Sequence, residues 1–133
     1  MFGQLGYAPD HPALEKSIEY MMSDQESDGA WFGRWGVNYI YGTGAVLPAL
    51  KALGGNMDSK AVRQAIDWLL DKQNSDGGWG ESCASYVDPS FRGKGHSTPS
   101  QTSWAILSMI AANKADSEAT TTVSYTHLRA HEP

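Results

Sequence analysis

Apolar side chains recur every three or four residues in several segments of the chain, as they do along one face of an α-helix. This spacing predicts helices over 12–25, about 46–53, about 59–73, and a fourth that begins at Thr98-Pro99. We expect the apolar face of the fourth helix to consist of Trp104, Leu107, Ile110 and Ala111. Loops rich in glycine or polar residues are expected from Ala30 to about Gly42 and over 80–97. No segment has a convincing strand pattern, so the predicted fold class is all-α.

One pattern occurs twice, 48 residues apart. An aromatic residue is followed by an apolar residue, then by Gln25, Gly29 and Trp31 in the first copy (16–31) and by Gln73, Gly77 and Trp79 in the second (64–79). Such a fixed period is typical of repeat architectures, in which stacked units bury one another's apolar faces. The chain holds about two and a half periods, so we expect it to be a piece of a longer array.

The repeated residue types suit a structural clamp between stacked units. A side-chain amide can bond carbonyls at one helix end and amides at the start of a neighbouring helix. Glycine allows the chain to reverse, and the indole covers the turn with a large apolar face. We therefore interpret Gln25, Gly29, Trp31, Gln73, Gly77 and Trp79 as clamp residues. A catalytic role is less well supported, because a single active centre seldom needs the same residue set twice.

The composition excludes several classes of partner. The net charge is −5, charged residues make up 19% and there is no basic run, so we expect no nucleic-acid partner. The single cysteine, Cys83, cannot form an internal disulfide, which fits a reducing compartment. No stretch approaches the roughly 18 apolar residues of a membrane-spanning helix. Five tryptophans and six tyrosines are a heavy aromatic load for 133 residues.

Residues 120–133 break every pattern described above. The segment has no glycine and no repeat motif, and it resembles the translated read-through of a sequencing adapter. We therefore expect residues 1–119 to form the folded part and 120–133 to be a non-native tail.

The repeat itself, aromatic-Leu-x3-Gln-x2–5-Gly-x-Trp, resembles the QW repeat of triterpene cyclases. The segments around it, 28–43, 76–83 and 95–104, are similar to the C-terminal half of the squalene–hopene cyclase family. The resemblance covers roughly residues 3–118, and Gly44 after Tyr-Gly-Thr is similar to the bacterial members. It implies a fragment of an (α/α) toroid built from helical hairpins.

The resemblance also implies an activity. Members of this family cyclise a linear polyprene such as squalene to a pentacyclic triterpene through a carbocation cascade, as isomerase-type intramolecular cyclases without cofactor or metal. Their acid lies in an Asp-x-Asp-Asp motif, which does not occur in 1–133, so this piece alone is expected to be inert.

Partners and location follow from the same resemblance. The expected partners are the polyprenyl lipid and the rest of the same chain. The resemblance leaves room for a homodimer and for a membrane surface contacted by the full-length enzyme. The expected location is the cytoplasmic face of the bacterial inner membrane, with peripheral or monotopic attachment.

Two residues match site residues of the family. Trp35 matches a cavity tryptophan near the acid and would bind substrate, because an indole face stabilises a cation without trapping it; the alternative is ordinary core. Tyr41 matches a tyrosine thought to help reprotonate the acid through water, which is a catalytic role; the alternative is a structural hydrogen bond. Tyr39, two residues earlier, has no assigned role.

Other interpretations find weaker support. Cys83, Asp88 and His96 are metal-ligand types, but their spacing matches no zinc pattern, so we expect no metal. Glu81 with Asp76 could suggest paired carboxylates, but Asp28 and Asp76 repeat with the period, which indicates turn residues. The alternative function is a non-cyclase α/α toroid, either a prenyltransferase-like subunit or a binding scaffold.

Overall fold

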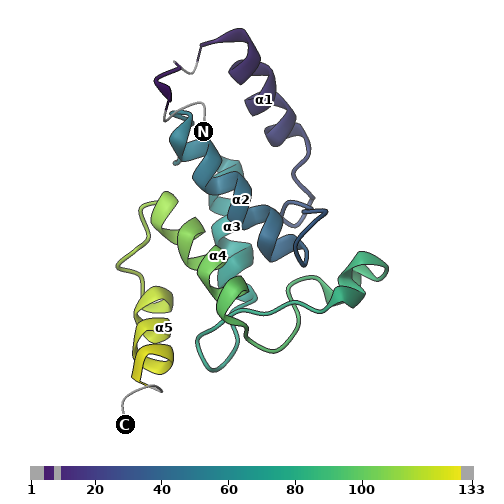
Figure 1. Cartoon of the computed structure of the whole chain (residues 1–133), viewed down its shortest axis with the longest axis vertical. Helices are drawn as coiled ribbons and strands as arrows, with labels where there is room; N and C mark the ends of the chain where they lie inside the picture. Colours follow the sequence, from purple (N-terminus) through teal and green to yellow (C-terminus); the bar gives the residue numbers. More distant parts are fainter. Residues whose placement is uncertain (1–4, 8–9, 130–133) are drawn as a thin grey trace.

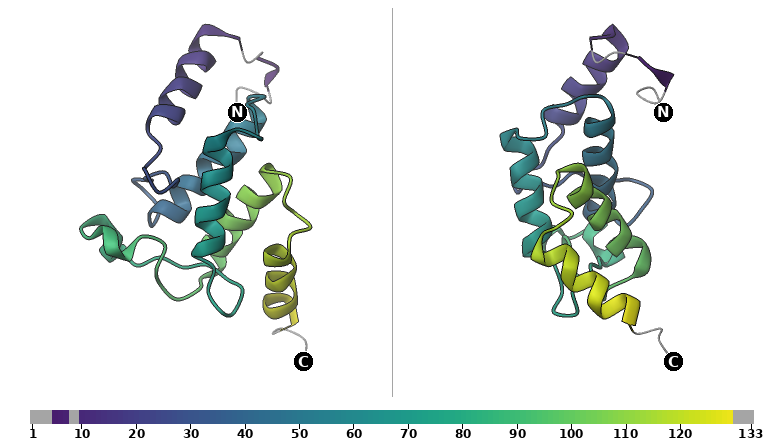
Figure 2. Two further views of the ribbon diagram at one scale, coloured as in Figure 1. Left: turned by 180° about the vertical axis from the view of Figure 1, so that it is seen from behind. Right: turned by 90° about the vertical axis from the view of Figure 1, so that its left-hand side faces the viewer.

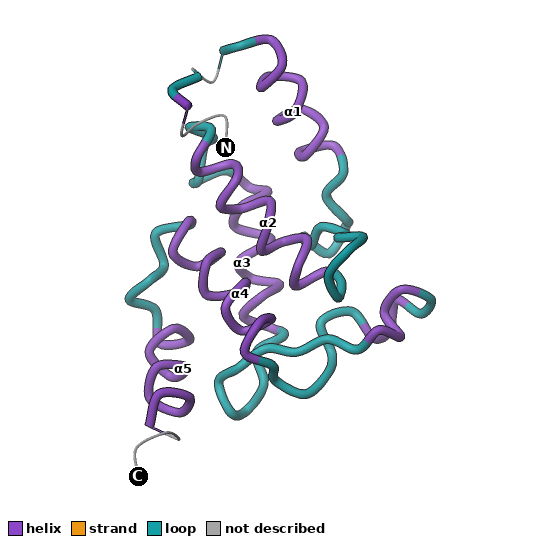
Figure 3. The backbone as a smooth tube through the Cα atoms, viewed as in Figure 1, coloured by secondary structure: helices purple, strands orange, loops and turns teal. Residues whose placement is uncertain are grey.

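The computed structural model describes residues 5–7 and 10–129. All regular secondary structure within these residues is helical, which confirms the all-α prediction (Figure 3). The elements in chain order are α1 (Pro12–Ser23), α2 (Tyr39–Ala52), α3 (Lys60–Asp71), the short 3-10 helices η2 (Cys83–Tyr86) and η3 (Pro89–Phe91), α4 (Pro99–Ala111) and α5 (Glu118–Arg129).

The helices α2 and α4 lie side by side at the centre of the molecule (Figure 1). Helix α3 forms a second layer, behind α2 and α4 in Figure 1 and in front of them in the left view of Figure 2. Helices α1 and α5 lie at opposite ends of this arrangement (Figure 1). The core is between the two layers, where the fully buried side chains include Ile40, Leu47, Leu69 and Met109.

Three predicted helix starts are confirmed by their capping bonds. The ring nitrogen Nδ1 of His11 accepts the N–H of Ala13 (3.3 Å), directly before Pro12. The hydroxyl of Ser59 accepts the N–H of Val62, and that of Thr98 accepts the N–H of Gln101, both at 3.3 Å. A side-chain acceptor at this position satisfies one of the free amides of the first turn, which is why helices begin after these residues.

The predicted start of the second helix was wrong. Helix α2 begins at Tyr39, seven residues before Val46, so the loop from Ala30 ends earlier than Gly42. Glycines and Pro48 lie within its sequence, and these residues have low helix propensity. The N-cap residue Asn38 makes no capping bond with its side chain. What stabilises this helix start is a residue from a distant loop, described below, which local sequence cannot reveal.

The predicted apolar face of the fourth helix was also wrong in part. Leu107 and Ile110 are about half exposed, at 49% and 50%. The buried side of α4 carries Met109 and, beside it, mainly small or polar residues, among them Gln101, Thr102, Ala105 and Ser108. Polar side chains can be buried when they are hydrogen-bonded, and those of Gln101, Thr102 and Ser108 are.

Helix α5 extends from the predicted folded part into the predicted tail. Its first turns belong to the core, because Ala119 and Val123 are only 8% and 5% exposed. A helical conformation does not tell where a sequence comes from, so the non-native origin of 120–133 stays a prediction. Residues 130–133 of the tail lie outside the described residues.

Candidate functional site

The two repeated glutamines make equivalent hydrogen bonds. The Nε2 of Gln25 donates to the carbonyl oxygens of Gly29 and Ala61, both at 2.8 Å. The Nε2 of Gln73 donates to the carbonyl oxygens of Gly77 (2.8 Å) and Ala119 (3.0 Å). In each case one bond closes the turn, and the other reaches the first turn of the next helix hairpin. From the sequence we expected each glutamine to contact backbone N–H groups at that helix start. Instead, its side-chain nitrogen donates to a backbone carbonyl there.

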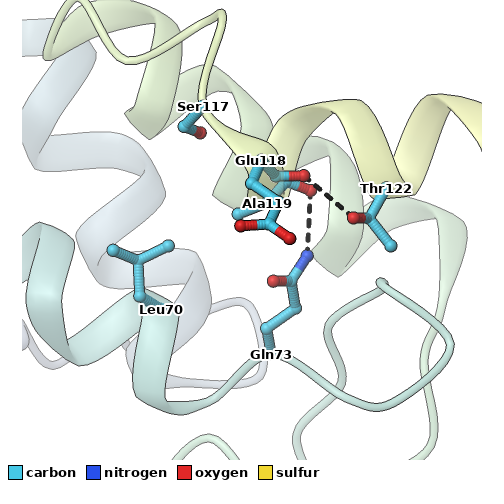
Figure 4. A pocket seen from close by; sticks show the side chains of 6 residues that line it. All are labelled: Leu70, Gln73, Ser117, Glu118, Ala119 and Thr122. Carbon is cyan, nitrogen blue, oxygen red and sulfur yellow. Dashed lines mark hydrogen bonds between the residues drawn. The ribbon is translucent and has the colours of Figure 1, made fainter.

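The second glutamine lies beside a hollow between α3 and α5. Figure 4 shows Gln73 pointing toward the backbone of Ala119, with Leu70 and Thr122 on either side. The hollow has a volume of about 420 Å³, and it is also lined by Ser117 and Glu118. The hydroxyl of Thr122 donates back to the carbonyl of Glu118 (2.9 Å).

The two repeated tryptophans are also bound in the same way. Their indoles are fully buried, and the Nε1–H of Trp31 donates to the carbonyl of Met21 (2.6 Å) as that of Trp79 does to Leu69 (2.7 Å). Each indole therefore ties the turn to the helix that precedes it. Gly29 and Gly77, with φ of 99° and 81°, adopt the left-handed backbone that glycine favours.

A threonine pair completes these units and was missed from the sequence. The hydroxyl oxygen of Thr43 accepts the backbone N–H of Trp31 (3.1 Å), and that of Thr102 accepts the N–H of Trp79 (3.0 Å). These threonines lie in α2 and α4. They are not 48 residues apart, because the loop before α4 is longer than the loop before α2. The fixed repeat period therefore gave no signal for them.

Tyr41 lies in the first turn of α2, where its ring is packed on both sides. One face meets the loop at Gly33 and Gly36, where a Cβ on Gly33 would lie 2.6 Å from Cδ1 of the ring and one on Gly36 would also overlap the ring. Trp104 of α4 contacts the same ring edge-on, with ring centroids 4.9 Å apart. The ring of Tyr41 is thus held by packing between the 33–36 loop and α4.

Trp35 lies at the tip of that same loop and is 90% exposed. The loop is tied down by Tyr86 of η2, whose hydroxyl lies 2.7 Å from the carbonyl oxygen of Arg34 and 2.5 Å from that of Gly36. One hydroxyl has a single proton, so these carbonyls compete for it. The structure therefore brings the two family-matched residues together, with Trp35 on the loop that packs against the ring of Tyr41.

Glu81 lies at the start of α2, the helix that carries Tyr41. Its Oε2 accepts the backbone N–H groups of Asn38 (3.0 Å), Tyr39 (2.8 Å) and Ile40 (3.0 Å), and its side chain is buried. The residue one repeat period earlier is Gly33, so the repeat pattern contains no equivalent carboxylate.

Arg92, from the same long loop, joins the second repeat to the turn of the first. Its guanidinium contacts Glu26 (3.1 Å) and Asp28 (3.5 Å) and lies over the ring of Tyr39, 4.2 Å from the centroid. The pKa of the Tyr39 phenol is raised, mainly by burial. The ring is therefore a neutral aromatic face for the guanidinium of Arg92. Tyr39 thus has a packing role.

The Oδ1 atom of Asp28 accepts the N–H of Ala30 (3.3 Å), as predicted for a turn residue.

Cys83, Asp88 and His96, which are of metal-ligand type, do not form a metal site in the described part of the chain. No three histidine, cysteine, aspartate or glutamate side chains come together there as a metal site would require, and Cys83 is exposed and free. Likewise, no helix in the described ranges is long and apolar enough to cross a bilayer.

Comparisons with known proteins agree with the geometry. The family model described as the squalene-hopene cyclase C-terminal domain matches residues 1–132. A squalene–hopene cyclase from Alicyclobacillus acidocaldarius is 62% identical over 118 residues, which are 89% of this chain and 19% of the relative. One from Zymomonas mobilis is 47% identical over 122 residues, 91% of this chain and 18% of the relative. A dammaradiene synthase from Dryopteris crassirhizoma is 42% identical over 113 residues, 77% of this chain and 16% of the relative.

The chain thus spans about a fifth of the length of the curated relatives it matches. The match over nearly the whole chain shows that it belongs to the squalene–hopene cyclase family, as part of the C-terminal domain and of that family's α/α toroid.

Proposed function

We propose that this chain is part of an enzyme that cyclises a linear polyprene, with squalene as the expected substrate, to a pentacyclic triterpene. The observation that carries this proposal is the 62% identity with a relative named squalene–hopene cyclase. The reaction rearranges bonds within one molecule, so it consumes no cofactor. The names of other relatives, such as dammaradiene synthase, favour triterpene cyclisation over a prenyltransferase-like subunit or a binding scaffold.

In this proposal Trp35 forms part of the wall of the substrate cavity. Its exposure of 90% argues against ordinary core packing within this chain, which was the alternative. An indole face stabilises a nearby cation by about 0.5–2 kcal/mol, more when water is absent, and it is too weak a nucleophile to trap the cation. The other walls, and the exclusion of water that a carbocation requires, would come from the rest of the protein.

Tyr41 acts in this proposal as a proton relay toward the acid. A phenol can accept a hydrogen bond with its oxygen and donate another with its proton, so it can return a proton through a bound water. Support comes from the way the ring is fixed, between the 33–36 loop and Trp104, with no hydrogen bond from its hydroxyl to any described residue. The acid itself belongs to a motif that 1–133 does not contain.

The clamp residues hold successive helical hairpins in register in this proposal. Each glutamine spans from its own turn to the following hairpin, and each tryptophan spans back to the preceding helix. Because the two sets make the same bonds, they fit a repeated structural device. They would keep the wall that carries Trp35 and Tyr41 rigid.

We further propose that the complete protein draws its lipid substrate from the cytoplasmic face of the inner membrane, attached peripherally. The reason is chemical, since a C30 hydrocarbon dissolves in the bilayer far better than in water. Fractionation of the complete protein with and without salt or detergent tests this location. A homodimer would be detected by the mass of the detergent-solubilised protein.

The activity can be tested by grafting. The segment of the Alicyclobacillus acidocaldarius relative that matches this chain is replaced by residues of this chain, and the product, called here the graft protein, is incubated with squalene. We expect pentacyclic triterpenes, identified by gas chromatography with mass spectrometry. The unaltered relative is the control. A folded graft protein that leaves squalene unchanged would disprove the proposed function.

A further inference from the structure

We propose that Glu81 is a positioning residue, whose buried carboxylate sets the first turn of α2 and thereby the ring of Tyr41. The proposal rests on the function proposed above, because Tyr41 matters for turnover only if the protein is a cyclase. Glu81 follows the second copy of the repeat motif (64–79) in the chain, whereas Tyr41, in α2, follows the first copy (16–31). The inference is therefore that one repeat positions a site residue carried by its neighbour.

The first argument is the geometry at the helix start. A helix begins with free N–H groups, and α2 lacks the side-chain cap that α3 and α4 have. Oε2 of Glu81 accepts three of these N–H groups at 2.8–3.0 Å, from a position more than 40 residues along the chain. Bonds from amides to a buried carboxylate are charge-assisted, and the positive end of the helix dipole adds to them.

The second argument is that Glu81 is itself held in place by α4. Its backbone N–H donates to Oε1 of Gln101 (2.5 Å), and Nε2 of Gln101 donates to the carbonyl oxygen of Val37 (2.9 Å). Trp104, which packs edge-on against the Tyr41 ring, lies one helical turn after Gln101. The same short network thus fixes both elements between which the ring of Tyr41 is held.

The third argument concerns the other carboxylate oxygen. Oε1 of Glu81 is buried and has no hydrogen-bond partner among the described residues, whereas Oε2 accepts all three amides. A glutamine can therefore present its own amide oxygen to the same three N–H groups while its NH2 group takes the place of Oε1. Glu81→Gln is the conservative variant, since it keeps the hydrogen bonds and removes the charge. Glu81→Ala removes both.

The test measures kcat and KM for squalene in the graft protein. Displacing a reacting group by about 1 Å can cost about 100-fold in rate, so we expect Glu81→Ala to lower kcat by about tenfold or more with KM nearly unchanged. Glu81→Gln should recover most of that loss. Asp88→Ala is the matched control, because Asp88 caps η3 in the same loop (2.8 Å to the N–H of Ser90) and should leave kcat unchanged.

Coupling to Tyr41 separates positioning from a general loss of structure. If Glu81 acts through Tyr41, Glu81→Ala should cost little in a Tyr41→Phe background, which is non-additive behaviour. Additive losses, or a kcat of Glu81→Ala equal to that of the parent graft protein, would overturn the proposal. If Glu81→Ala does not fold, the double-mutant cycle with Tyr41→Phe is measured with Glu81→Gln and with the shorter Glu81→Asp instead. Equal kcat values for these two Glu81 variants would overturn the proposal. An inactive parent graft protein would instead disprove the proposed function itself.

Discussion

The side-chain amide of Gln25 donates a hydrogen bond of 2.8 Å to the backbone carbonyl of Ala61, 36 residues further along the chain. The bond joins the turn of the first repeat to the first turn of α3, the helix that leads into the second repeat. A glutamate has almost the same shape as glutamine but offers no donor to this carbonyl or to that of Gly29.

We therefore expect Gln25→Glu to lower the free energy of unfolding by about 1–3 kcal/mol, because two part-buried carbonyls lose their partner and face a carboxylate. Denaturant unfolding followed by circular dichroism measures the change. Gln64→Glu is the control, because Gln64 is exposed on α3 and should change stability by less than about 0.5 kcal/mol. Equal stability of the two variants would contradict the clamp.

Gly29→Ala tests the turn itself. At φ of 99° an added Cβ is strained, by about 1–2 kcal/mol, and it would also lie 2.7 Å from the carbonyl oxygen of Gln64. Gly6→Ala separates the two effects, because Gly6 has φ of 80° with nothing within 4 Å of an added Cβ. We expect Gly29→Ala to destabilise the protein more than Gly6→Ala in thermal unfolding. Equal losses in the two variants would mean that backbone strain alone matters.

Trp35→Ala should change the products without changing the fold. The side chain is 90% exposed, so we expect the free energy of unfolding to shift by less than about 0.5 kcal/mol. In the graft protein, loss of the indole face should increase the share of incompletely cyclised products, because cations are quenched earlier. Val87→Ala, at a position 86% exposed in the neighbouring loop, is the control. An unchanged product distribution would remove the cavity-wall role.

Tyr41→Phe removes only a hydroxyl and keeps the ring contacts. We expect kcat of the graft protein to fall by roughly tenfold or more while thermal stability is preserved, as for the loss of a proton-transfer group. Tyr39→Phe is the matched control, because that ring also lies in the first turn of α2 but packs under Arg92. Wild-type turnover in Tyr41→Phe would rule out the relay.

Tyr86→Phe should loosen the loop that carries Trp35. The variant keeps the edge-on contact with Phe32, whose ring centroid is 5.8 Å away, but loses the hydroxyl that serves the loop carbonyls. We expect a stability loss of about 1 kcal/mol. The product shift should have the same direction as in Trp35→Ala but be smaller. If the products do not change, the hydroxyl supports stability alone.

Much of the local structure could be predicted from the sequence. Helix periodicity predicted three helix starts, which the capping bonds of His11, Ser59 and Thr98 confirm, and the repeated Gln, Gly and Trp indicated stacked units. These features depend on residues near one another in the chain. The partners of the glutamines could not be predicted, because Ala61 and Ala119 lie 36 and 46 residues away and the long loop over 80–97 breaks the period.

The sequence by itself determined the helical class, the repeat register and the residue types at each turn, because periodicity, caps and glycine turns act within a few residues. Only the tertiary structure decided where α2 begins, since its first amides bond to Glu81 from the next repeat. It also decided that α4 buries Gln101 and Ser108 while Leu107 is half exposed. The physical reason is the same in both cases: a buried polar group needs a partner, and these partners come from distant segments.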